Sequence, residues 1–171
     1  LSNVQRQICH GTNDVGKTKV QSAVEEIERV NATIKVTGFE QKADTQLLQQ
    51  LLPSMDLVVD CSDNLDIRYS INDACLEHKL PWVSGAAVAL QGQVICFDPR
   101  LENQPCYRCL YPQVSDEQVN CSTSGILAPV VGIIGTLQTL EAIKIITGIG
   151  KPILGRLRTF DALESQWRSW G

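Results

Sequence analysis

The feature that most constrains the fold is residues 56–64, DLVVDCSDN, which lead into the helical pattern LDIRYSIN at residues 65–72. A short apolar run bounded by polar residues is typical of a buried parallel strand. Ser62 or Asp63 is the expected helix N-cap. Ligands of open α/β sheets bind at the carboxyl ends of strands, so Asp60, Asp63 and Asn64 would line a site mouth and offer two carboxylates to a metal or substrate. In the simpler interpretation, Asp63 is only a cap and Asp60 a solvated turn residue.

Further βα patterns surround this stretch. Helices are predicted at residues 17–31, 44–52, 65–79 and 130–147, and strands at residues 33–38, 56–61, 81–87, 91–98, 154–163 and 166–170. This alternation predicts an α/β fold with a mostly parallel, Rossmann-like sheet, flanking helices and antiparallel C-terminal strands. Gly132 and Gly135 suggest close packing of the last helix against the sheet or a partner.

Length and composition exclude several classes of protein. The 171 residues suit one domain, residues 1–171, and the net charge of −4 gives no electrostatic footprint for nucleic acid or a membrane surface. The apolar stretch at residues 125–148 is interrupted well short of the roughly 18 residues of a membrane span. Seven cysteines, an odd number, without a signal-peptide pattern indicate a reducing cytosol and a cytoplasmic protein.

The N-terminal region offers groups suited to anions. Asn3, Gln5 and Arg6 carry donors for phosphate or carboxylate, although a solvated loop would have the same composition. Lys19 lies in the first turn of the helix at residues 17–31, where a cation opposes the helix dipole. A nearby anionic ligand would explain that lysine, and an ordinary surface position would also accommodate it.

Three further cysteines stand in polar surroundings. Cys106 and Cys109 form a Cys-x-x-Cys pair, which suggests half of a tetrahedral zinc site, with a dithiol redox pair as the alternative. Cys121 lies in the polar run SDEQVNCSTS at residues 115–124, where it is either reactive or incidental.

The motifs together resemble the ThiF/MoeB family, the bacterial relatives of the ubiquitin-activating enzymes. The resemblance rests on LSNVQRQ, GKTK, DLVVDCSDN, VSGAA, GQV, CYRC, the Cys121 loop, PVVGIIGTLQTLEAIKIITG and FDAL, in order along the whole chain. It implies ATP-dependent adenylylation of the C-terminal glycine carboxylate of a ubiquitin-like sulfur-carrier protein. The tail SQWRS and Asn120-Cys121 look most similar to the thiamine branch, which acts on a ThiS-like carrier, and the molybdopterin-synthase branch is the alternative.

The resemblance also implies roles for single residues. Arg6, Lys19, Asp63 and Cys121 would be catalytic: Arg6 and Lys19 hold phosphates, Asp63 holds Mg²⁺, and Cys121 attacks the adenylate or carries sulfur. The nucleotide would also contact Ser2, Asn3, Gln5 and Asn64. Cys106 and Cys109 would supply half of a structural zinc site. The expected partners are the carrier, a sulfur donor such as a cysteine desulfurase, and a second copy in a homodimer.

Parts of the family pattern are absent from these residues: the N-terminal glycine-rich strand–loop–helix for phosphate, the acidic ribose-binding residue and the second Cys-x-x-Cys. We therefore expect residues 1–171 alone not to turn over ATP. Two other classes stay open. A non-catalytic module could dock a ubiquitin-like protein, although it would not need Arg6, Lys19 and Asp63. A dinucleotide-dependent oxidoreductase would share the fold but would leave CYRC and the Cys121 loop unexplained.

Overall fold

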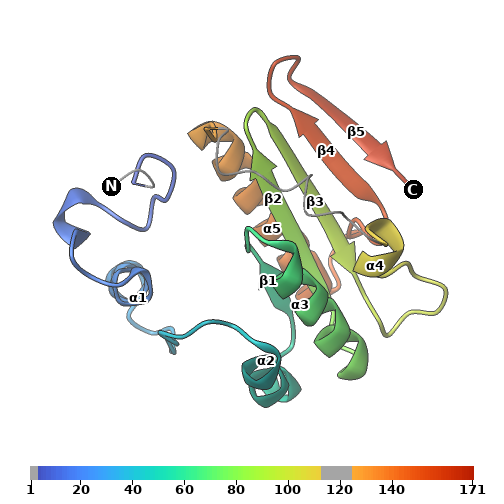
Figure 1. Ribbon diagram of the computed structural model, residues 1–171, viewed down its shortest axis with the longest axis horizontal. Coiled ribbons are helices and arrows are strands. Elements are labelled where there is room, and N and C mark those ends of the chain that lie inside the picture. The colour runs from blue at the N-terminus through green and yellow to red at the C-terminus, as the bar shows by residue number, and fades with distance from the viewer. Residues whose placement is uncertain (1–3, 113–124) are drawn as a thin grey trace. The chain divides into compact units, whose positions relative to one another are not determined.

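The computed structural model describes residues 4–112 and 125–171 (Figure 1). The chain divides into two compact units, Leu1–Lys42 and Ala43–Gly171. The first contains the short 3₁₀ helix η1 (Thr12–Asp14) and the helix α1 (Lys19–Val30). Thr18 caps α1, since its side chain accepts a hydrogen bond from the Gln21 backbone N–H at 3.1 Å.

The second unit is built on a five-stranded sheet in the order β1-β2-β3-β4-β5. Its strands are β1 (Val58–Asp60), β2 (Trp82–Val88), β3 (Gln91–Phe97), β4 (Leu157–Asp161) and β5 (Gln166–Trp170). β1 and β2 are parallel, and the other three pairs are antiparallel. β5 lies at the edge of the sheet, and all five of its residues are exposed.

Helices cover both faces of this sheet (Figure 1). One face packs against α3 (Leu65–Glu77) and the short α4 (Tyr107–Leu110) around Trp82, Ile95 and Phe97. α2 (Thr45–Leu51) and η2 (Leu52–Ser54) add Leu48 and Leu52 to the same core. The other face packs against α5 (Ala128–Thr147) around Val83, Val94 and Cys96. Alternate side chains along β2 and β3 therefore serve two separate cores.

Two glycines of the sheet allow α5 to approach it closely. A Cβ at Gly85 would overlap the Gln138 side chain, and one at Gly92 would overlap Ile134. By contrast, a Cβ at Gly132 or Gly135 would meet no described atom, so these helix glycines do not explain packing against the sheet. The small residues that allow the close contact therefore lie on the strands. The prediction that Gly132 and Gly135 allow close packing of the helix against the sheet was wrong.

A buried carboxylate anchors the C-terminal half of α5. Glu141 is fully buried and accepts hydrogen bonds from the Ile153 backbone N–H at 2.7 Å and from Lys144 Nζ at 2.6 Å. Burying a charge is favourable only where such partners replace water. By length and composition, α5 is long and apolar enough to cross a membrane, but its buried Gln138 and Glu141 are both bonded to other parts of this unit. These contacts are those of a core helix.

The α/β class, the flanking helices and the antiparallel C-terminal strands are confirmed, and three predictions need correction. A mostly parallel sheet was expected, but in the described sheet only the β1–β2 pair is parallel. Residues 33–38 form no strand, although Ile34 and Val36 alternate with polar residues; Ile34 is exposed, so the alternation does not mark a buried face. The N-cap of α3 is Asn64, whose Oδ1 accepts from the Ile67 N–H at 3.1 Å, and not Ser62 or Asp63.

We expect Gly92→Ala to destabilise the protein by about 1–3 kcal/mol, because the new methyl group overpacks the contact with Ile134. The matched control is Gly125→Ala, whose Cβ would meet no described atom, and we expect its effect to stay within about 0.5 kcal/mol. Urea unfolding of both variants measures the difference. Equal stability of the two would show that close approach of α5 does not depend on Gly92.

Candidate functional site

The loop after β1 holds Asp63 at the carboxyl end of the parallel β1–β2 pair. Ser62 donates its backbone N–H to Asp60 Oδ1 at 2.9 Å, and Arg68 Nη2 donates to the Ser62 carbonyl. Asn64 then caps α3. Asp63 lies between these two anchors, is exposed, and makes no hydrogen bond or ion pair with another described residue. Its oxygens are therefore available to a ligand.

Asp60 is not a second ligand, contrary to the prediction. Its side chain is only 2% exposed, and Oδ2 accepts from Ser84 Oγ at 2.8 Å and lies 3.6 Å from Arg68 Nε. Its backbone carbonyl accepts from Gln138 Nε2 at 2.7 Å. Because Asp60 is also the last residue of β1, these contacts tie its side chain and backbone to both helix layers. Its role in this arrangement is to support the loop.

A pocket of about 470 Å³ opens over the same sheet. Arg68 lines it on the α3 side, and β2 and β3 contribute small and amide side chains. β4 and β5 complete the walls with polar and aromatic groups. The lining residues are Arg68, Ala86, Val88, Gln91, Gly92, Gln93, Thr159, Phe160, Asp161, Gln166, Arg168 and Trp170. Amide side chains and two arginines among apolar groups suit an extended polypeptide segment, which presents backbone carbonyls and N–H groups.

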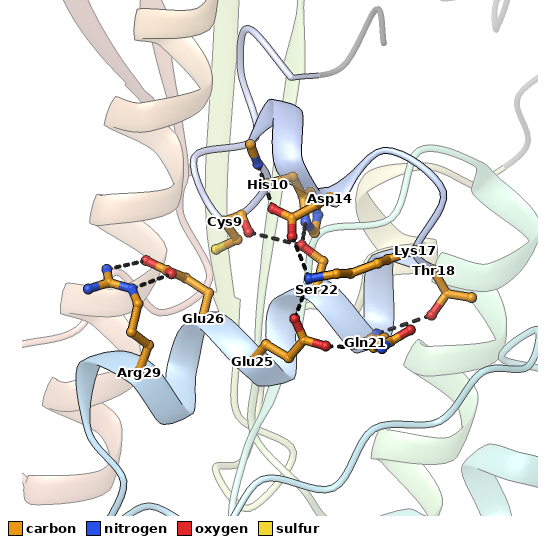
Figure 2. Close-up of polar contacts among 11 residues, drawn as sticks. Cys9, His10, Asp14, Lys17, Thr18, Gln21, Ser22, Glu25, Glu26 and Arg29 are labelled. Carbon is orange, nitrogen blue, oxygen red and sulfur yellow. Dashed lines mark hydrogen bonds and ion pairs between the residues drawn. The ribbon is translucent and has the colours of Figure 1, made fainter.

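In the first unit, a polar network supports the start of α1 (Figure 2). Ser22 is buried; its Oγ lies 2.9 Å from His10 Nδ1 and donates to the Cys9 carbonyl at 3.3 Å. Lys17 Nζ lies between Asp14 Oδ1 at 3.0 Å and Glu25 Oε2 at 2.5 Å. Glu25 raises the pKa of Lys17, chiefly by hydrogen bonding. These contacts hold the loop that leads to Lys19.

Lys19 is the first residue of α1, is exposed, and lines a pocket of about 200 Å³ together with Gly16, Lys17 and Thr18. Backbone N–H groups at a helix start and a nearby lysine favour an anion. Arg6 is half-buried and Gln5 is exposed in the same unit. The structure therefore groups Arg6, Gln5 and Lys19 in one unit, and Asp63 and Asn64 in the other.

Cys106 and Cys109 lie at the start and within α4, with their sulfur atoms 3.3 Å apart. Hydrogen bonds from Cys106 lower the pKa of the exposed Cys109, whereas burial raises that of Cys106. Two converging thiols fit half of a tetrahedral zinc site, in which each Zn–S bond is about 2.3 Å. Within the described residues, no group of three or more potential ligands gathers, so the structure offers two of the four ligands that zinc requires.

The other cysteines of the second unit are poorer candidates. Burial raises the pKa of Cys75 and of Cys96 to about 12, and it also raises the pKa of Cys61. A thiol with a raised pKa is seldom a thiolate at neutral pH. Cys121, Ser2 and Asn3 lie outside the described residues, and their predicted roles stay predictions.

Sequence reasoning missed the groups that support the Asp63 loop: Arg68, Ser84 and Gln138. Arginine is usually exposed, yet Arg68 is buried on α3. The available signal was its position, because Arg68, Ile71, Asn72 and Cys75 recur at helical spacing on one buried stripe. A polar residue on such a stripe needs partners inside the protein.

The sequence model of the ThiF family matches residues 1–170. This chain belongs to the ThiF family. Its assignment to the ThiF/MoeB group from sequence motifs is confirmed.

Relatives come from both expected branches. The chain is 42% identical over 169 residues to the sulfur carrier protein ThiS adenylyltransferase of Escherichia coli, covering 99% of this chain and 66% of that protein. It is 40% identical over 168 residues to the molybdopterin-synthase adenylyltransferase of the same organism, covering 98% and 67%. It is also 42% identical over 170 residues to the adenylyltransferase and sulfurtransferase MOCS3-1 of Zea mays, covering 98% and 36%. The chain thus spans about two thirds of the bacterial relatives.

Solved structures agree on the fold. A crystal structure of E. coli MccB with ATP superposes with a TM-score of 0.83 at 21% identity, covering 99% of this chain and 52% of that one. The structure of PaaA gives a TM-score of 0.80 at 23% identity, covering 99% and 52%. At this identity the likeness establishes the architecture and not the substrate.

We expect Cys109→Ser to lower the zinc content of the full-length protein from about one ion per chain to below about 0.1, because a structural site needs all four ligands. Cys9→Ser is the matched control, since Cys9 is also an exposed free cysteine. Plasma mass spectrometry of protein purified without chelators gives the metal content. Zinc-free wild-type protein, or equal zinc in the two variants, would contradict the half-site assignment.

Proposed function

We propose that the protein containing this chain adenylylates the C-terminal glycine carboxylate of a ubiquitin-like sulfur carrier with ATP. The observation that carries the proposal is the exposed Asp63 at the carboxyl end of the β1–β2 pair, which makes no hydrogen bond or ion pair with another described residue. Its loop is bonded to Arg68, which also lines a pocket able to hold an extended polypeptide end. Identity of 40–42% to two adenylyltransferases of this kind supports the same chemistry.

In the proposed reaction, a carrier carboxylate oxygen attacks the α-phosphorus of ATP. The new bond is an acyl–phosphate bond, and the bond to the bridging oxygen breaks and releases pyrophosphate. Two anions must approach each other, so positioning and neutralisation of charge lower the barrier most. Arg6 would contact phosphate oxygens through its planar fork, and Lys19 would act as a compact charge at the start of α1. Ser2, Asn3, Gln5 and Asn64 would add neutral contacts to the nucleotide.

Asp63 fits a magnesium ligand by the chemistry of its oxygens. Mg²⁺ prefers oxygen donors and is usually held by one or two carboxylates together with phosphates and water. When bound, the ion would supply neutralisation of phosphate charge. The chain's own contribution is the fixed loop on which Asp63 stands, between the bonded Ser62 and the capping Asn64.

We place the carrier in the thiamine branch first, with a ThiS-like carrier, and keep the molybdopterin branch as the alternative, because the two relatives differ little in identity. In this assignment Cys121 attacks the adenylate or carries sulfur, and the sulfur comes from a donor such as a cysteine desulfurase. The protein would work in the cytoplasm as a homodimer. The exposed apolar side chains on the outer side of α5 (Ile133, Leu140, Ile143 and Ile146) would contribute to the dimer contact.

We expect Asp63→Ala to lower carrier-dependent ATP–pyrophosphate exchange by about 10²–10³-fold, as loss of a group that stabilises transition-state charge does. Asp66→Ala is the matched control, because Asp66 is also an exposed aspartate and lies in the first turn of α3. Its exchange rate should stay within about twofold of wild type. An equal loss of exchange activity in the two variants would show that Asp63 has no specific role in the reaction.

Offering each candidate carrier separately to the full-length protein decides the branch. We expect exchange with the thiamine carrier, and exchange with the molybdopterin carrier alone would move the assignment to the other branch. Binding of a carrier without any exchange, by a protein that retains Asp63, would overturn the enzymatic proposal. That result would favour a docking module.

A further inference from the structure

Arg68 interacts with several buried polar groups. Its Nη2 donates to the Ser62 carbonyl, and its Nε lies 3.6 Å from Asp60 Oδ2 but makes no hydrogen bond with another described residue. Hydrogen bonding from its guanidinium lowers the pKa of Tyr107, which burial raises more strongly. A buried donor whose hydrogen-bonding capacity is not filled is costly, so the Arg68 guanidinium can take a further acceptor.

Arg68 also stands between two features that the proposed reaction must bring into use together. On one side it lines the 470 Å³ pocket over β2–β5. On the other it contacts both ends of the short segment before Asp63: the Asp60 carboxylate at 3.6 Å and the Ser62 carbonyl. The Arg68 side chain is only 10% exposed, so α3 and its neighbours restrict where the guanidinium can lie.

We propose that Arg68 is a positioning residue that couples occupancy of the sheet-face pocket to the loop carrying Asp63. The inference rests on the proposed function, since the occupant is the extended C-terminal segment of the carrier. A backbone carbonyl of that segment accepts a hydrogen bond from the Arg68 guanidinium, which lines the pocket. The same contact holds Arg68 against Ser62 and Asp60, and so orders the loop in the geometry that binds the metal–nucleotide complex.

Coupling of this kind is reciprocal: the carrier strengthens binding of the nucleotide by the same factor by which the nucleotide strengthens binding of the carrier. Lysine keeps the charge of Arg68 but has no fork that can reach two groups in fixed directions. Arg68→Lys should therefore retain much of each separate affinity and lose most of the coupling. A merely structural role would change stability without changing this ratio.

The experiment uses the full-length protein, the carrier that supports exchange, and Mg²⁺ with a non-hydrolysable ATP analogue. Calorimetric titration gives the carrier Kd with and without the nucleotide. We expect a ratio of about tenfold for wild type, within the usual range of coupling between sites, and below about twofold for Arg68→Lys. Arg100→Lys is the matched control, because Arg100 also pairs with an aspartate, Asp98 at 2.7 Å, but lies outside the pocket and the Asp63 loop. Its ratio should equal that of wild type.

Tyr107→Phe covers the case in which Arg68→Lys does not fold. It removes the hydroxyl that hydrogen-bonds with the Arg68 guanidinium, so the guanidinium is held less firmly, and the coupling ratio should fall several-fold. The proposal would be overturned by a ratio near one in the wild-type protein, or by a ratio in Arg68→Lys or in Tyr107→Phe that equals that of the wild type. Absence of exchange with every carrier, by contrast, would refute the proposed function itself.

Discussion

The site in the second unit depends on how Asp60 is held from both faces of the sheet. From the α5 side, Gln138 donates to its backbone carbonyl, and it can reach that position because residue 85 is glycine. From the α3 side, Arg68 approaches its carboxylate, and within the sheet Ser84 donates to the same group. A carboxylate this deeply buried is tolerated only with such partners. The contacts stabilise the end of β1 at the point where the chain turns toward α3.

The different roles of Asp60 and Asp63 follow from this arrangement. Asp60 and Asp63 are three residues apart and chemically identical, yet one is buried in a network and the other faces solvent. Alternation along an extended chain sends successive side chains to opposite sides, so a short separation in sequence can separate a supporting group from a ligand-binding one. The polar network behind the loop limits the motion of the loop. Less conformational entropy is therefore lost when a ligand binds there.

The sequence predicted most elements of the fold because their patterns are local. The helical spacing of residues 17–31, 65–79 and 130–147 and the apolar run before Asp60 each correspond to a helix or strand close to the expected bounds. The strand at residues 33–38 was wrong because alternation alone does not provide a pairing partner. For the site, the motif placed Asp63 correctly at the end of β1. It could not show that Asp60 is buried or that Arg68 supports the loop, since both depend on contacts between residues distant in sequence, such as Ser84 and Gln138.

The exposed edge strand β5 affects how the isolated chain associates with other molecules. An edge strand presents a row of backbone donors and acceptors that can pair with a strand of another molecule. β5 places Trp167 and Trp170 there, 41% and 55% exposed, so a new strand would also find apolar surface. Arg168, between the two tryptophans, is the charged residue that counteracts such pairing. Residues 1–171 expressed by themselves are therefore prone to pairing between β5 strands of different molecules.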